Sequence, residues 1–186
     1  MTAVFEARSY MIRRQVLKIF GAGFHVYGPG DEVLAYCQQK AFKLKEDIRV
    51  FQEEAQATPL LTIKARQAID FSAAYDIVDA TTGVKVGAAR RKGLRSIMRD
   101  AWEVLDENDA PIGRLEEDSM GKAMARRFLS NLIPQSFDLG SGVQFKQRFN
   151  PFIYKLEVRI QETDIDPRLV FGVAVLIAAI EGRQQS

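Results

Sequence analysis

The sequence has one cysteine, one histidine and a net charge close to zero, and each of these features argues against a particular class of function. Because Cys37 is the only cysteine, the chain cannot form an internal disulfide, and it suits a reducing compartment. His25 is the only histidine, which limits any histidine-based triad or metal site to one imidazole. The formal net charge of +2 is too small to predict binding to nucleic acid or membranes from bulk charge.

Signals for export and for catalysis are also missing. Residues 1–15 (MTAVFEARSYMIRRQ) lack the continuous apolar run of a signal peptide, so we expect a cytoplasmic protein. The glycines at 83, 87 and 93 do not form the strand–loop–helix pattern of a phosphate-binding loop. Four aspartates belong to hairpins, where this residue favours local backbone hydrogen bonds: Asp76, Asp79, Asp106 and Asp109. We therefore expect no enzyme, no cofactor, no obligate metal and no nucleic-acid partner.

What is present fits a soluble globular protein of one domain. The 186 residues are 47% hydrophobic and 27% charged, and a chain of this length can bury a sizeable core. No linker, low-complexity tract or charge block divides the sequence. We expect a single domain over residues 1–186.

The longest hydrophobic run closes the chain, and it predicts a buried helix. From Leu169 to Ile180 every residue is apolar or glycine. Asp166 as N-cap and Pro167 at the first helical position predict the start, and Gly182 predicts the stop. A helix that is apolar all round must be enclosed, and this run is shorter than the roughly 20 residues that cross a bilayer. The side chains expected in the core include Leu169, Phe171, Ala174, Leu176, Ala178 and Ile180.

Most of the preceding chain predicts short strands joined by polar turns. The predicted strands are 10–20, 24–27, 32–40, 47–53, 60–67, 75–79, 84–87, 102–106, 112–115, 137–139, 143–149 and 152–161. Residues 75–87 and 102–115 repeat one plan: an aromatic residue, an acid, two aliphatics, Asp, a polar turn, then an aliphatic residue and Gly. Residues 24–35 are a looser third copy. Recurring hairpins favour an antiparallel meander, and the one interruption is a predicted helix at 119–132.

The order of these elements resembles the LURP-one-related family, within the larger tubby-like and phospholipid-scramblase-like group. The resemblance depends on residues 10–15 (YMIRRQ), 24–27 (FHVY) before the turn at 28–30 (GPG), and 40–44 (KAFKL). The repeated hairpins and the final run at 166–181 (DPRLVFGVAVLIAAIE) complete it. The similarity covers nearly the whole chain.

The resemblance implies a mainly β protein with two helices. Its centre is a closed antiparallel barrel of roughly twelve strands around the apolar C-terminal helix. Closure would remove the sheet edges. The family implies no catalytic site. Its relatives are linked to membrane lipid, through phosphoinositide binding in tubby-like proteins and calcium-dependent lipid redistribution in scramblases.

Two basic segments are candidate sites for anionic lipid. The first segment contains Arg90, Arg91, Lys92, Arg95 and Arg99. It lies near a hairpin end, where an arginine could make bidentate hydrogen bonds to a phosphate. A solvated loop is the simpler interpretation of this charge run.

The second basic segment is the polar side of the predicted helix at 119–132. Lys122, Arg126 and Arg127 lie opposite two methionines and a phenylalanine, as in helices that lie on anionic membranes. Packing of the apolar side on the barrel is the simpler interpretation of this pattern.

Residues 163–166 (TDID) resemble the acidic segment before the terminal helix of scramblases. Two acids are too few for calcium, which takes six to eight oxygen ligands, and capping explains Asp166.

The sequence thus predicts a non-enzymatic tubby-like barrel that binds anionic lipid or a membrane-associated protein, and associates peripherally with membranes. Two alternatives stay open. One is a scramblase-like membrane-active protein whose helix enters lipid. The other is a small-ligand-binding or hydrolytic domain with a pocket at one end of the barrel.

Overall fold

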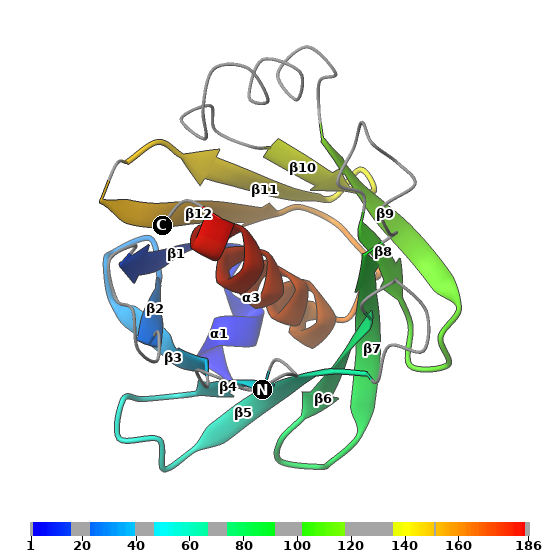
Figure 1. The fold of residues 1–186 in the computed structure, drawn as a ribbon, viewed down its shortest axis with the longest axis horizontal. Helices are drawn as coiled ribbons and strands as arrows, with labels where there is room; N and C mark the ends of the chain where they lie inside the picture. Colours follow the sequence, from blue (N-terminus) through cyan, green and yellow to red (C-terminus); the bar gives the residue numbers. More distant parts are fainter. Residues whose placement is uncertain are drawn as a thin grey trace.

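The computed structural model describes residues 2–15, 23–39, 47–66, 74–91, 102–117, 136–150 and 152–184. In this part of the chain, twelve antiparallel strands close into a barrel around a helix (Figure 1). The first six strands are β1 Ser9–Gln15, β2 Gly23–Tyr27, β3 Val33–Gln39, β4 Asp47–Phe51, β5 Pro59–Ala65 and β6 Ala74–Asp79. The last six are β7 Lys85–Arg91, β8 Trp102–Leu105, β9 Pro111–Glu117, β10 Ser136–Leu139, β11 Val143–Arg148 and β12 Ile153–Ile160. The helices are α1 Ala3–Glu6 and α3 Pro167–Gln184.

Each strand pairs with its neighbours in the chain, and the first pairs with the last. β1 lies antiparallel to β12, from Ser9 opposite Arg159 to Gln15 opposite Ile153. Because β1 also pairs with β2, the sheet has no open edge at this seam. The predicted meander and its closure into a barrel are confirmed.

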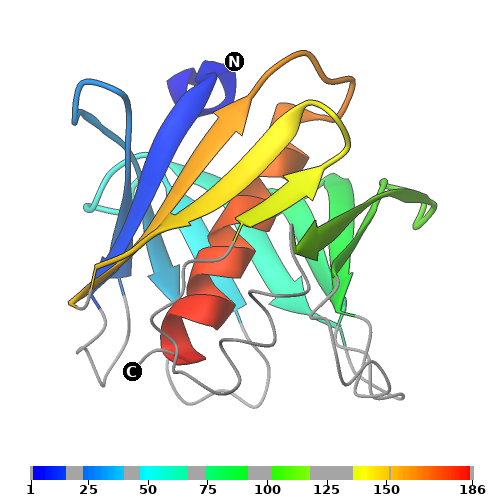
Figure 2. The ribbon, with the colours of Figure 1, turned by 90° about the horizontal axis from the view of Figure 1, so that it is seen from above.

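The direction of the strands divides the barrel into two ends. The turns that follow β2, β4, β6, β8 and β10 lie at the end where α3 begins, and β12 also finishes there (Figure 2). The odd-numbered strands finish at the opposite end, where α3 ends. We call these the entry end and the exit end of the barrel, after the points where α3 begins and ends.

Alternation along the strands separates an apolar interior from a polar outer wall. In β12, Tyr154, Leu156 and Val158 are buried, while Lys155 and Glu157 between them face outward. β11 follows the same period of two, with every second residue exposed. The hydrophobic face of the closed sheet therefore lines a lumen that something must fill.

α3 fills that lumen. Every residue from Leu169 to Ile180 is buried, and the apolar side chains among them are at most 6% exposed. Two glycines permit the close approach: a Cβ on Gly172 would lie 2.6 Å from Ile77 Cγ2, and a Cβ on Gly87 would lie 2.8 Å from Leu169 Cδ1. The predicted core helix is confirmed. None of the helices among the described residues is long and apolar enough to cross a membrane.

The helices differ from the sequence-based prediction in two places. α3 continues past Gly182 to Gln184, so Gly182 is not its stop, since Arg183 and Gln184 are favourable helix formers that continue the helix. The sequence does not predict the four-residue α1, which is too short to show a helical period. Its Phe5 packs edge-on against Phe171, with ring centroids 5.7 Å apart. The predicted helix at 119–132 lies outside the described residues.

The enclosure of α3 predicts a strong effect of charge at its centre. Ala174 has no exposed surface, so Ala174→Asp would bury a carboxylate without a partner, at a cost of at least several kcal/mol. We expect no soluble folded protein, measured by soluble yield and circular dichroism. Ala57→Asp, in the exposed turn after β4, is the control and should fold normally. A stable, folded Ala174→Asp protein would contradict the enclosure.

Candidate functional site

The apolar side chains of α3 and of the inner strand faces are buried inside the barrel, and two hollows among the described residues open at the surface. One hollow of about 380 Å³ lies at the entry end, between α1 and the start of α3, and includes Phe5, Ile165 and Val170. Another of about 340 Å³ lies beside the turn between β10 and β11 and includes Asp138 and Arg159.

A cluster of ion pairs connects the first turn of α3 to the barrel wall. Arg168, in its first turn, contacts Asp79 Oδ2 of β6 at 2.7 Å through Nη1 and Asp166 Oδ2 at 2.6 Å through Nη2. Asp166 Oδ1 also accepts the backbone N–H of Arg168 at 2.8 Å, which confirms the predicted helix cap. Burial opposes ionisation of Asp79, but hydrogen bonds from Thr81 and Arg168 lower its pKa to about 2. This cluster joins the helix to the barrel wall.

A buried arginine fastens the opposite part of the helix. Arg14 points inward from β1, and its Nη1 donates hydrogen bonds to the carbonyl oxygens of Ala179 at 2.5 Å and Ala178 at 3.3 Å. These two carbonyls lie more than one turn before the last residue of α3, Gln184. Sequence reasoning misses this role, because Arg14 interrupts an otherwise apolar inner face. α3 is thus held near both ends.

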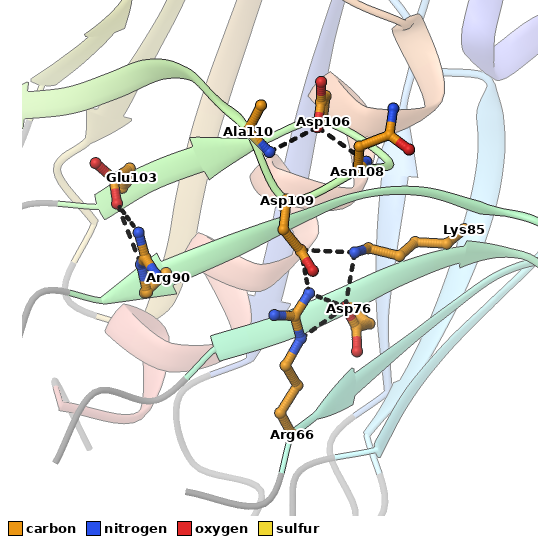
Figure 3. A network of polar contacts seen from close by, with 9 residues as sticks. All are labelled: Arg66, Asp76, Lys85, Arg90, Glu103, Asp106, Asn108, Asp109 and Ala110. Carbon is orange, nitrogen blue, oxygen red and sulfur yellow. Dashed lines mark hydrogen bonds and ion pairs between the residues drawn. The ribbon is translucent and has the colours of Figure 1, made fainter. Parts of the chain in front are cut away.

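Four charged residues on the outer wall form a balanced network (Figure 3). Arg66 Nη2 lies 2.5 Å from Oδ1 of Asp76 and 2.5 Å from Oδ1 of Asp109, and Lys85 Nζ lies 2.6 Å from the same Asp109 oxygen. The hydrogen bonds from Arg66 and Lys85 lower the pKa of Asp109. Two cations face two carboxylates, so the network ties the turn between β8 and β9 to β6 and β7 and leaves no excess charge for a ligand.

The predicted basic segment begins at the end of β7, and its first arginine is engaged within the protein. Arg90 contacts Glu103 Oε2 at 2.5 Å through Nη2, and the Glu103 side chain is almost completely buried (Figure 3). The Arg91 guanidinium lies 5.9 Å from the centre of the Trp102 ring. The other predicted lipid-binding residues lie outside the described residues: Lys92, Arg95, Arg99, Lys122, Arg126 and Arg127. Their role stays a prediction.

Strand pairing brings together a second basic surface that the sequence did not predict. Arg148 of β11 lies opposite Lys155 of β12, and Lys155 lies opposite Arg13 of β1. We call these three residues the cationic row. Lys146 lies two residues before Arg148 on the same outer face. The residues come from three strands, one of them distant in the sequence, so only the register of the barrel reveals the row.

Few acids neutralise this surface. Glu157 accepts a hydrogen bond from Arg148 Nε at 2.6 Å and another from Arg159 Nε at 2.8 Å. One negative charge thus lies beside two positive charges. Burial opposes ionisation of Glu157, but these bonds lower its pKa. Arg13 pairs with Asp31 and lies over the Tyr27 ring. Within the described ranges, Lys146 and Lys155 have no ion-pair partner.

The single histidine and the single cysteine do not form a catalytic pair. His25 Nε2 lies 2.7 Å from Glu54 Oε1 on the outer wall, and its ring packs 5.2 Å from that of Tyr36. Cys37 faces the interior, where burial raises the pKa of its thiol, so the residue packs in the core as a neutral group. Among the residues that the structure describes, no group of three or more His, Cys, Asp or Glu could hold a metal ion.

The fold and the site define a β-barrel filled by its own helix, with charged surfaces on the outer wall. The sequence model of LURP-one-related proteins matches residues 9–178, which is most of the chain. The chain belongs to the LURP-one-related family, as its sequence suggested. A comparison with curated proteins finds no match.

The low pKa of Asp79 predicts a pH-dependent contribution to stability. Its carboxyl titrates at about 2 in the folded protein against 3.8 ordinarily, which corresponds to about 2 kcal/mol of stability above pH 4. This contribution is lost as the pH falls through 2. We expect Asp79→Asn to lower the free energy of unfolding by about 2 kcal/mol at pH 7, and by less as the pH falls, in urea titrations.

The matched control is Asp31→Asn, because Asp31 also pairs with an arginine but its side chain is 74% exposed. Asparagine tolerates the positive φ of 61° found at this position. We expect less than about 1 kcal/mol of destabilisation there. Equal effects of the two substitutions on the free energy of unfolding, or an Asp79→Asn effect that does not change with pH, would contradict a stabilising role of the ionised Asp79 carboxylate.

Proposed function

We propose that this LURP-one-related protein is a non-enzymatic binding module that attaches peripherally to anionic phospholipid surfaces through the outer wall of its barrel. The observation that carries the proposal is the cationic row of Arg148, Lys155 and Arg13. Supporting it, α3 occupies the lumen, where barrels of other kinds hold small ligands. The proposal needs no catalytic group.

The cationic row is unusual because like charges lie directly opposite each other. Side chains at directly opposed positions of adjacent strands have Cβ atoms about 4.5–5.5 Å apart, and like charges there are destabilising. Such a row is stabilised when an anion lies across it. Lys155, at its centre, has no acid partner among the described residues and is available for such a contact.

The chemistry of the row suits phosphate groups. Arginine can contact a phosphate with two parallel hydrogen bonds, and lysine adds a point charge. Each cation near an anionic membrane surface contributes about 1 kcal/mol, and salt screens the attraction over about 8–10 Å. Lys146 and Lys155, which have no acid partner among the described residues, thus supply about 2 kcal/mol at low salt, and the acid-paired Arg13 and Arg148 add less, which suits a reversible attachment.

The scramblase-like alternative would require α3 to leave the barrel. Departure would break the contacts of Arg168 with Asp79 and of Arg14 with the carbonyls of Ala178 and Ala179. It would also expose the apolar inner faces of the strands to water. These costs favour a barrel that binds with its helix in place.

Binding to vesicles tests the proposal. We expect the protein to sediment with vesicles of phosphatidylcholine containing about 30% phosphatidylserine, more weakly as salt rises, and not with phosphatidylcholine alone. Since each lysine contributes about 1 kcal/mol, Lys155→Gln should weaken binding about fivefold, and Lys146→Gln with Lys155→Gln about thirtyfold. Neither lysine makes an ion pair within the described residues, so both variants should keep the stability of the wild type.

Lys64→Gln is the matched control. Lys64 is an exposed lysine in the outer face of β5, on the far side of the barrel from β12. We expect its replacement to leave the affinity unchanged. If Lys64→Gln weakened binding as much as Lys155→Gln, attraction would depend on total charge rather than on the row. Absence of wild-type binding to the anionic vesicles would refute the proposal.

A further inference from the structure

The turn between β11 and β12 carries two exposed phenylalanines. Phe149 is 56% exposed and Phe152 is 69% exposed, and they are the exposed aromatic residues of the described chain. Isolated exposed apolar residues are common on protein surfaces. Here two large aromatic side chains stand on either side of one hairpin turn, which concentrates apolar area at a point. We call Phe149, Asn150 and Phe152 the hairpin tip.

The hairpin tip is held in place by local hydrogen bonds. Asn150 Oδ1 accepts the backbone N–H of Phe152 at 3.0 Å and that of Ile153 at 2.9 Å. Behind the turn, the register of the two strands is set by the pairing of Arg148 with Lys155. The hairpin reaches the exit end of the barrel, where α3 ends (Figure 2). The two phenylalanines therefore lie at one end of the molecule, and Asn150 bonds the backbone beside Phe152.

The cations lie directly behind the aromatic residues. Arg148 precedes Phe149 by one residue, and Lys155 follows Phe152 by three. At about 3.3 Å per residue of strand, the phenylalanines lie at most about 10 Å beyond the cationic row. Membrane-bound elements bury their apolar groups about 5–10 Å into the boundary of headgroups and acyl chains, with basic groups at the phosphates. The spacing of the tip and the row matches this layering.

We propose that Phe149 and Phe152 insert into the interfacial layer of an anionic phospholipid bilayer, while the cationic row contacts the phosphates above them. The inference rests on the proposed function, because the row must first hold the membrane surface. The charge of the surrounding surface selects this occupant: cations next to an aromatic tip are complementary to anionic headgroups above an apolar layer. Insertion orients the exit end of the barrel toward the membrane.

Phe152→Trp reports insertion directly. The native Trp102 is buried, with 1% of its surface exposed, so its emission forms a constant background. With vesicles containing about 30% phosphatidylserine, an anionic lipid, we expect the emission of the introduced tryptophan to shift to shorter wavelength. We also expect quenching by lipids brominated near the headgroup end of the acyl chains.

Removal of the aromatic side chains measures their contribution. We expect Phe149→Ser with Phe152→Ser to weaken binding to the same vesicles at least about tenfold, with an unchanged melting temperature, since both residues are exposed. The matched control is Val33→Ser with Val84→Ser. These residues are 53% and 59% exposed and lie at the entry end of the barrel. The control should bind as the wild type does.

Three outcomes would overturn the inference. If the wild type binds anionic vesicles but the emission of the Phe152→Trp protein does not shift and the double serine variant binds normally, the tip does not insert, while the proposed function stands. If the wild type does not bind such vesicles, the proposed function fails first. A concentration-dependent blue shift without vesicles would show that the tip contacts a second copy of this chain instead.

Discussion

The enclosure of one apolar helix is the constraint on which the rest of the structure depends. α3 presents apolar side chains in every direction from Leu169 to Ile180, so it is stable only where no side of it meets water. A closed sheet with alternating inward and outward residues supplies that environment without leaving an edge. The lumen is therefore filled by the helix, and the charged side chains lie mainly on the outer wall.

Buried and half-buried charges fix how the helix sits within the sheet. A cation in the first turn of a helix is unfavourable for the helix dipole, but Asp166 and Asp79 compensate Arg168 there. Nearer the other end, Arg14 donates hydrogen bonds to the carbonyl oxygens of Ala178 and Ala179. Apolar contacts alone would allow α3 to slide along the barrel axis or to rotate about its own axis. These directional contacts select one depth and one orientation.

Local patterns are sufficient to predict the helix and the hairpins, since each depends on residues close together in the chain, and the order of these elements along the chain indicates the family. Three features escape prediction because they depend on pairing between strands. Arg90 belongs to a visible charge run, yet its partner Glu103 is supplied by β8. The acceptors of Arg14 on α3 and the neighbours that complete the cationic row are likewise supplied by distant parts of the chain. The continuation of α3 past Gly182 escapes prediction for another reason, because glycine is only a weak stop signal within a helix held by tertiary packing.

Hydrogen exchange of the backbone amides of α3 tests the enclosure of the helix most directly. We expect the amides of residues 173–177 to exchange only through global unfolding, with a protection free energy equal to the free energy of unfolding measured with urea. Exchange of these amides near the rate of an unprotected helix, while the amides of β1 and β12 stay protected, would show that α3 leaves the barrel. Such a result would contradict the permanent enclosure of α3 by the barrel.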